Sequence, residues 1–177
     1  MATRATARGA GSRKAQGNSS YAIYRTGGTT PEIAFTLLLV LTARRWRSLL
    51  DEHLRRIEQS SARMEALAAI LNSPPLSAQV DIAKRLRIEG PTLTRMLDTL
   101  EKDGLVERLS DPADRRTKQL RVTDAGETVL EEMFDVSDEL RARLLDGIDP
   151  ATIATMNEFF AGLLERLDGG LAAPGGG

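Results

Sequence analysis

Two groups of basic and short polar residues carry side chains suited to binding an array of hydrogen-bond acceptors. In the first group, Arg95 is flanked by Thr92 and Thr94 and follows closely on Pro91. The second group is the run Asp114-Arg115-Arg116. A guanidinium is a planar fork of donors that matches paired acceptors such as O6 and N7 of guanine, and small neighbours permit close approach. An arginine on a turn can also enter the electronegative minor groove, with its guanidinium held by a nearby carboxylate. These two groups therefore predict contacts with DNA.

The first group must be presented by a helix over residues 91–102. Its apolar residues recur at i, i+3, i+4 and i+7, namely Leu93, Met96, Leu97 and Leu100. At 100° per residue, the opposite face carries Pro91, Arg95, Asp98 and Lys102. The helix has a stop signal in Asp103-Gly104. One face of this helix is therefore expected to pack inward, while the other presents Arg95 to a partner.

The flanking segments complete the pattern of a winged helix-turn-helix. Ser77 is expected to cap a short preceding helix with Ile82, Ala83 and Leu86 facing inward. Residues 87–90 interrupt the helical pattern and separate this helix from the next one. Residues 105–110 and 118–123 alternate apolar and polar side chains around the turn-forming residues 111–114, which predicts a hairpin. Helix, turn, helix and hairpin follow one another in the order of that DNA-binding motif.

The rest of the chain is mostly helical. A first helix is expected to begin with Thr30 as N-cap and Pro31, a second opens at Ser61, and a third begins with a capping box of Asp124 and Glu127. We expect a basic arm without stable structure at 1–30, a long helix at 31–60, a DNA-binding lobe at 61–123, two helices at 124–168 and an unstructured tail at 169–177. The predicted fold class is mainly α with a small β-hairpin wing.

Composition removes several classes of function. The 177 residues contain no cysteine and one histidine, His53, so thiol chemistry is excluded and no histidine cluster for a metal exists. No nucleophile and base pair is visible, so an enzyme is poorly supported and no cofactor is expected. The longest apolar stretch, residues 33–43, is too short to cross a membrane, and the N-terminus has no apolar signal core. We therefore expect a cytoplasmic protein with no membrane partner.

The formal net charge of −1 hides a polarised chain. Residues 1–30 contain five basic groups and no acidic one, whereas residues 124–177 contain three basic and twelve acidic groups. Residues 77–123, which hold the predicted DNA-binding elements, carry ten basic and eight acidic groups. The final third of the chain is acidic and the remainder is basic, so the net charge of the whole chain is no argument against binding to nucleic acid.

The segment 88–106, together with Asp114-Arg115-Arg116 and residues 120–123, resembles the MarR family of transcriptional regulators and looks most like its SlyA branch. The likeness runs from about Trp46 to Met133. It implies a homodimer in which the first and the last two helices form the dimerisation platform. It further implies a repressor that binds a pseudo-palindromic operator in double-stranded DNA through two such helices and two wings.

The resemblance also assigns roles to single residues. Arg95 corresponds to the arginine that contacts bases, Pro91 and Thr92 to the N-terminal contacts of the same helix, and Arg108 to a basic strand position that touches the DNA backbone. Arg115 and Arg116 match the wing arginines and Asp114 the wing carboxylate, with Arg116 favoured for the groove. The predicted DNA-binding set is completed by four further polar residues: Ser77, Gln79, Thr94 and Lys118.

A small-molecule effector is a further implication of this resemblance. Some members of the branch bind aromatic carboxylates such as salicylate, and Arg44 aligns with a basic residue of that pocket. We expect an aromatic acid or a thioester of one at Arg44, Trp46 and Met64, although Met64 stands where the branch often has an aromatic residue. The alternative is that Arg44 and its basic neighbours simply flank Trp46.

Plainer interpretations remain open at this stage. Arg95 could be a surface charge paired with Asp98 or Glu101, and His53 a solvated helix residue. The acidic pairs after residue 124 favour a solvated face over acid-base catalysis, because adjacent helical positions point apart. The basic arm could be mere solubilising sequence or could reach DNA beside the operator. The main alternative function is a constitutive architectural DNA-binding protein without an effector.

Overall fold

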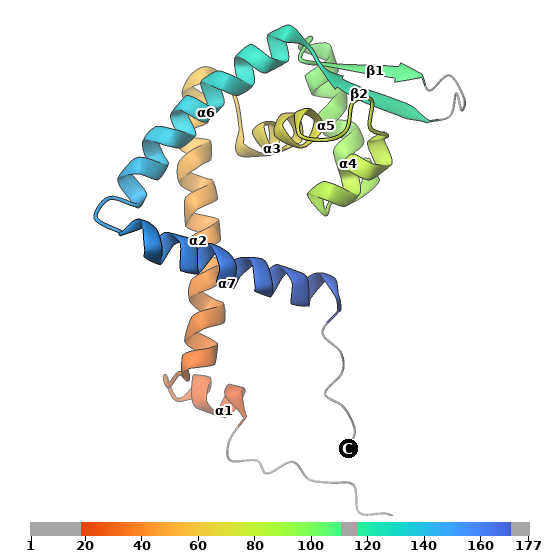
Figure 1. The fold of residues 1–177 in the computed structure, drawn as a ribbon. Coiled ribbons are helices and arrows are strands. Elements are labelled where there is room, and N and C mark those ends of the chain that lie inside the picture. Colours follow the sequence, from red (N-terminus) through yellow and green to blue (C-terminus); the bar gives the residue numbers. More distant parts are fainter. Residues whose placement is uncertain (1–18, 111–116, 171–177) are drawn as a thin grey trace, which may run out of the picture. The chain divides into compact units, whose positions relative to one another are not determined.

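The computed structural model describes residues 19–110 and 117–170 (Figure 1). The chain divides into two compact units, residues 1–49 and 50–177. In the first unit, helix α1 covers Ser20–Arg25, where the sequence predicts an arm without stable structure. Ser19 caps this helix, since its hydroxyl accepts from the Ala22 amide at 3.3 Å. The prediction for residues 1–30 is therefore wrong at α1, while residues 1–18 lie outside the described chain.

Helix α2 spans Pro31–Leu54 and is followed by a short 3₁₀ turn, η1, at Arg55–Ile57. The predicted N-cap is confirmed, because Thr30 Oγ1 accepts from the Ile33 amide at 3.3 Å. The first half of α2 is rich in apolar residues, and its large apolar side chains are exposed: Phe35, Leu37, Leu38, Leu39, Val40 and Leu41. A helix that is apolar all round normally has its sides covered.

The second unit contains the remaining helices and one two-stranded sheet. The helices are α3 (Ser61–Leu71), α4 (Gln79–Leu86), α5 (Gly90–Lys102), α6 (Asp124–Leu144) and α7 (Pro150–Asp168), and the strands are β1 (Val106–Ser110) and β2 (Lys118–Val122). The mainly helical fold with one hairpin confirms the predicted class. Among the described residues, no helix combines the length and apolar character that a membrane crossing requires.

The core of this unit forms where α3 meets α4, α5, α6 and β2. Helix α5 buries Leu93, Leu97 and Leu100 completely, as its apolar period predicts. The other fully buried large side chains include Leu54, Leu67, Ile82, Leu120 and Met133. On α3, Ile70 is buried, whereas the next residue, Leu71, is 47% exposed.

The hairpin pairs β1 with β2 in antiparallel register, from Val106 opposite Val122 to Ser110 opposite Lys118. Both strands lie within one residue of the predicted segments. The loop before α4 adds to this sheet, since Ala78 bridges to Gln119 and the Leu120 amide donates to the Ser77 carbonyl at 3.1 Å. The hairpin is thereby fastened to the start of α4.

Two predicted helix caps are wrong. Ala78, not Ser77, stands at the N-cap of α4, because the Ser77 carbonyl pairs with β2 and its hydroxyl donates to the Pro74 carbonyl at 2.7 Å. At α6 the N-cap is Thr123 and not Asp124, since Thr123 has an extended backbone and its Oγ1 accepts from the Gly126 amide at 3.0 Å. Pairing between distant segments decides both starts, and this pairing has no local sequence signal.

The junction between the hairpin and α6 is tightly packed. Thr123 Oγ1 also donates to the Gly104 carbonyl at 2.7 Å, and the Thr123 amide donates to the Leu105 carbonyl at 3.1 Å. A Cβ on Gly126 would lie 2.1 Å from the Leu105 carbonyl oxygen. Position 126 therefore has no room for a side chain, and the first turn of α6 is held directly against the base of β1.

Candidate nucleic-acid interface

Helix α5 presents a polar face to solvent. Pro91, Thr92 and Arg95 are exposed on it, while Leu93 and Leu97 anchor the opposite face in the core. The side chain of Arg95 makes no hydrogen bond or ion pair with any residue in the described ranges. The alternative in which Arg95 pairs with Asp98 or Glu101 is wrong, because both carboxylates bind another arginine. The guanidinium of Arg95 is thus available to a partner.

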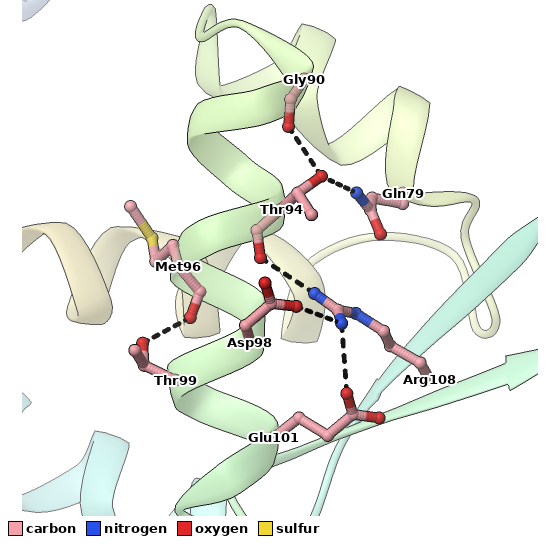
Figure 2. A network of polar contacts seen from close by, with 8 residues as sticks. All are labelled: Gln79, Gly90, Thr94, Met96, Asp98, Thr99, Glu101 and Arg108. Carbon is pink, nitrogen blue, oxygen red and sulfur yellow. Dashed lines mark hydrogen bonds and ion pairs between the residues drawn. The ribbon is translucent and has the colours of Figure 1, made fainter.

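Helix α4 is tied to α5 near the N-terminus of α5. Gln79 Nε2 donates to Thr94 Oγ1 at 2.8 Å, and that hydroxyl donates to the Gly90 carbonyl at 3.0 Å (Figure 2). Both side chains are half-buried. Gln79 and Thr94 were expected to contact DNA, and the structure uses these polar atoms to fix one helix against the other. Contacts of Gln79 and Thr94 with DNA remain a prediction. They would have to use atoms that these two hydrogen bonds do not occupy.

The resemblance assigns Arg108 a contact with the DNA backbone, and in the structure its side chain contacts α5. It projects from β1 onto α5, where Nη1 lies 2.6 Å from Asp98 Oδ1 and 3.2 Å from Glu101 Oε2 (Figure 2). Nη2 donates to the Thr94 carbonyl at 3.0 Å. The side chain is 17% exposed, and its Nε is buried without a hydrogen-bond partner among the described residues. The guanidinium is therefore already bound by groups of α5.

Ser77 lies in the loop beside β2, and Lys118 is the first residue of β2. Ser77 is half-buried, and its hydroxyl and carbonyl are both used in the loop and sheet contacts described above. Lys118 is exposed at the start of β2, and its Nζ donates to Ser110 Oγ at 2.9 Å across the hairpin. Of these two predicted contacts, Lys118 has the charge and the exposure that a phosphate contact needs.

The predicted wing residues Asp114, Arg115 and Arg116 lie outside the described residues. The strands that lead to them are paired up to Ser110 and Lys118. The contacts of the three wing residues with DNA remain a prediction from the sequence.

The predicted effector residues belong to different parts of the molecule. Arg44 is exposed and Trp46 half-buried in α2, within the first unit. Met64 is 8% exposed in the core of the second unit, on α3. Met64 thus has a packing role, and a role for these three residues in effector binding stays a prediction.

Sequence reasoning missed the part that Asp98 and Glu101 play. Both were noted only as possible partners of Arg95 on the same helix, and their actual partner comes from β1. The three positions that Arg108 touches, Thr94, Asp98 and Glu101, are spaced i, i+4 and i+7 and so share one stripe of α5. This spacing is a signal that could have suggested a common cation.

The chain is similar in sequence and in structure to known transcriptional regulators. Residues 60–118 match the MarR family. The crystal structure of the transcriptional regulator PA3341 is similar at 32% identity, covering 76% of this chain and 98% of that protein, with a TM-score of 0.68. A cysteine-to-serine mutant of MarR from E. coli, complexed with operator DNA, matches at 27% identity over 75% and 94% of the two chains, also with a TM-score of 0.68.

A third structure, a complex of MepR from S. aureus with DNA, matches at 22% identity over 75% of this chain and 97% of that one, with a TM-score of 0.67. At this identity the match shows the fold alone. Helices α3 to α5 and the hairpin thus form the winged helix-turn-helix of these proteins.

Proposed function

Because this chain belongs to the MarR family of transcriptional regulators, we propose that it is a repressor that binds a pseudo-palindromic operator as a homodimer. The family consists of DNA-binding regulators rather than enzymes. Within the family, the motif around Arg95 supports placement in the SlyA-like branch. Residues 61–123 form the DNA-binding lobe in this proposal, and 31–60 with 124–168 form the dimerisation platform.

The observation that carries the proposal is the combination of exposure and anchoring at Arg95. Its guanidinium is exposed and unpaired among the described residues, while the helix beneath it is fixed by three fully buried leucines: Leu93, Leu97 and Leu100. A rigid helix with one free arginine and short polar neighbours at its N-terminal end fits the major groove, where arginine binds guanine O6 and N7. Two copies in a dimer would read half-sites about one helical turn, roughly 10 bp, apart.

The exposed apolar residues support a dimer. Besides the first half of α2, helix α7 exposes five large apolar side chains: Met156, Phe159, Phe160, Leu164 and Leu167. Exposed large apolar side chains that gather on one helix normally mark an interface between proteins. A second copy of the chain is the partner that the family relationship supports, and it would contribute the second Arg95.

Release from DNA is proposed to follow the binding of a small aromatic acid or a thioester of one. The support is the likeness of Arg44 to a basic residue of the effector pocket in the SlyA branch, with Trp46 nearby on the same helix. Such a ligand can shift the dimer away from DNA only if it binds the released conformation more tightly than the DNA-bound one.

The test is a binding-site selection on random duplexes, repeated with a panel of aromatic acids and their thioesters. The expected result is one pseudo-palindromic motif and a set of acids that lowers the yield of bound DNA. Bound pools without any shared motif would instead support a constitutive architectural DNA-binding protein. A shared motif whose bound yield no acid lowers would still support a repressor, but one without such an effector.

A further inference from the structure

Arg108 bridges two elements that the proposed function requires to act together. It belongs to β1, the strand that leads towards the wing residues, and its guanidinium contacts α5 at three points over two helical turns (Figure 2). The contacts are the carboxylates of Asp98 and Glu101 and the carbonyl of Thr94. Ion pairs and hydrogen bonds to charged groups fix geometry more strongly than neutral ones. Arg108 therefore sets the position of α5 relative to β1.

The same contacts change the charge that α5 presents. Asp98 and Glu101 lie on the helix that carries Arg95, and their side chains are 57% and 43% exposed. Without a cation, two carboxylates here would repel the phosphates that flank a major groove. The guanidinium of Arg108 lies 2.6 Å and 3.2 Å from them and offsets this charge. The effect requires no contact between Arg108 and DNA.

A direct phosphate contact by Arg108 conflicts with its surroundings. Both terminal nitrogens already bind groups of α5, and Nε is buried. The side chain would have to leave two carboxylates to reach a phosphate, and that would leave both carboxylates beside the DNA without a cation.

We infer that Arg108 is a positioning residue for DNA binding: it holds α5 against β1 and neutralises Asp98 and Glu101, so that Arg95 can enter the major groove. This inference rests on the proposed function. It assigns Arg108 a role different from the backbone contact that the sequence resemblance implies.

The hairpin supplies a matched control. Arg121, on β2, pairs with Glu107, its cross-strand neighbour on β1. Because successive strand residues point to opposite faces, this pair lies on the face of the hairpin opposite to Arg108. Arg121→Met and Arg108→Met each remove one paired guanidinium from the same hairpin, so they change the net charge equally.

The experiment measures operator affinity and its salt dependence for the wild type, Arg108→Met, Arg121→Met and Arg108→Lys, with thermal unfolding alongside. The operator is the duplex obtained by selection with the wild type. Arg108→Met is expected to weaken binding about tenfold or more, from the loss of charge-assisted bonds. The slope of log affinity against log salt is expected to stay unchanged, because no phosphate contact is lost. Arg121→Met should bind within about threefold of the wild type, as an exposed pair contributes little.

Neutralising the two carboxylates provides a rescue. Asp98→Asn with Glu101→Gln, added to Arg108→Met, should recover part of the lost affinity, since the repulsion disappears. If Arg108→Met does not fold, the triple variant carries the test: it lacks the cation and both carboxylates, and it should keep the wild-type salt slope, whereas a lost phosphate contact lowers that slope by about 0.9. Arg108→Lys keeps the charge but not the fork, and it should bind more weakly than the wild type with an unchanged slope.

Two results would overturn the inference. One is a salt slope lowered by about 0.9 in Arg108→Met, with no rescue, which is the signature of one lost phosphate contact. The other is equal binding by the Arg108 and Arg121 variants. Absence of any selective binding by the wild type would overturn the proposed function and this role together, and it is seen before any variant is compared.

Discussion

Arg63 Nη2, near the start of α3, lies 2.8 Å from Asp103 Oδ2, the residue that ends α5. Arg63 Nε also donates to Gln59 Oε1 at 2.8 Å, and its side chain is only 18% exposed. The C-terminal end of α5 is thus held by α3, while Gln79 holds Thr94 nearer its N-terminal end. A helix fixed near both ends presents Arg95 in one orientation, which reduces the ordering cost of binding.

Arg95→Ala should cost about 1–3 kcal/mol of binding free energy at the selected operator and should relax base preference at one position of each half-site. The physical reason is the loss of a forked contact to a base edge. Fluorescence anisotropy with matched and single-base-changed duplexes measures both effects. Lys102→Ala removes a positive charge from the other end of the same helix and serves as the control. An equal loss of affinity on random DNA would reduce Arg95 to a phosphate contact.

Arg116→Ala should weaken operator binding by about 1.5–3 kcal/mol, the net contribution of a hydrogen bond to a charged group. Arg115→Ala is the neighbouring control and should have the smaller effect, because the spacing from Asp114 favours Arg116 for the minor groove. A gel-shift titration is sufficient. Unchanged operator binding by both variants would contradict a contribution of Arg115 and Arg116 to DNA binding.

Phe160→Asp should convert a dimer into a monomer. Phe160 is 41% exposed on α7, within the apolar surface that we propose to be covered by a second copy. A carboxylate there would be buried without a partner in the dimer, at a cost of several kcal/mol. Light scattering after gel filtration should give twice the chain mass of 19.3 kDa for the wild type and for the control Glu158→Gln, and a single mass for the variant. A wild type that elutes as a stable monomer contradicts the dimer.

Gly126→Ala should destabilise the fold by about 1–3 kcal/mol, the usual cost of forcing extra atoms into a packed site. Its Cβ would lie 2.1 Å from the Leu105 carbonyl oxygen, and backbone cannot move aside as a flexible side chain can. Thermal unfolding without DNA measures the change. The control is Gly90→Ala, where a Cβ meets nothing within 4 Å and stability should stay within about 0.5 kcal/mol. Equal unfolding temperatures for the two variants would show that the junction is not tightly packed.

The sequence pattern predicted most helices and strands because the spacing of apolar residues determines which face of each element can be buried. The apolar period over Leu93–Leu100 placed α5 and its buried face, and alternation placed both strands within one residue. The caps at Ser77 and Asp124 were wrong because these starts depend on pairing with segments far away in the sequence. Propensity alone does not contain this information.

In the candidate site too, local pattern predicted one residue correctly and missed the contacts of another. Arg95 could be predicted because its position opposite an apolar stripe makes it exposed. Arg108 could not, since its orientation follows from the packing of β1 on α5, and two carboxylates of another element decide where its guanidinium goes. The internal partners of a basic residue decide how its side chain is oriented, and the sequence pattern did not reveal them for Arg108.

The most direct test of the account is guanine N7 methylation interference on the selected operator, with the wild type and Arg95→Ala. N7 lies in the major groove, where the arginine fork would bind. The account predicts two interfering guanine positions about 10 bp apart for the wild type, and loss of both in the variant. Interference that is unchanged in Arg95→Ala, or that is absent from the wild type, would contradict it.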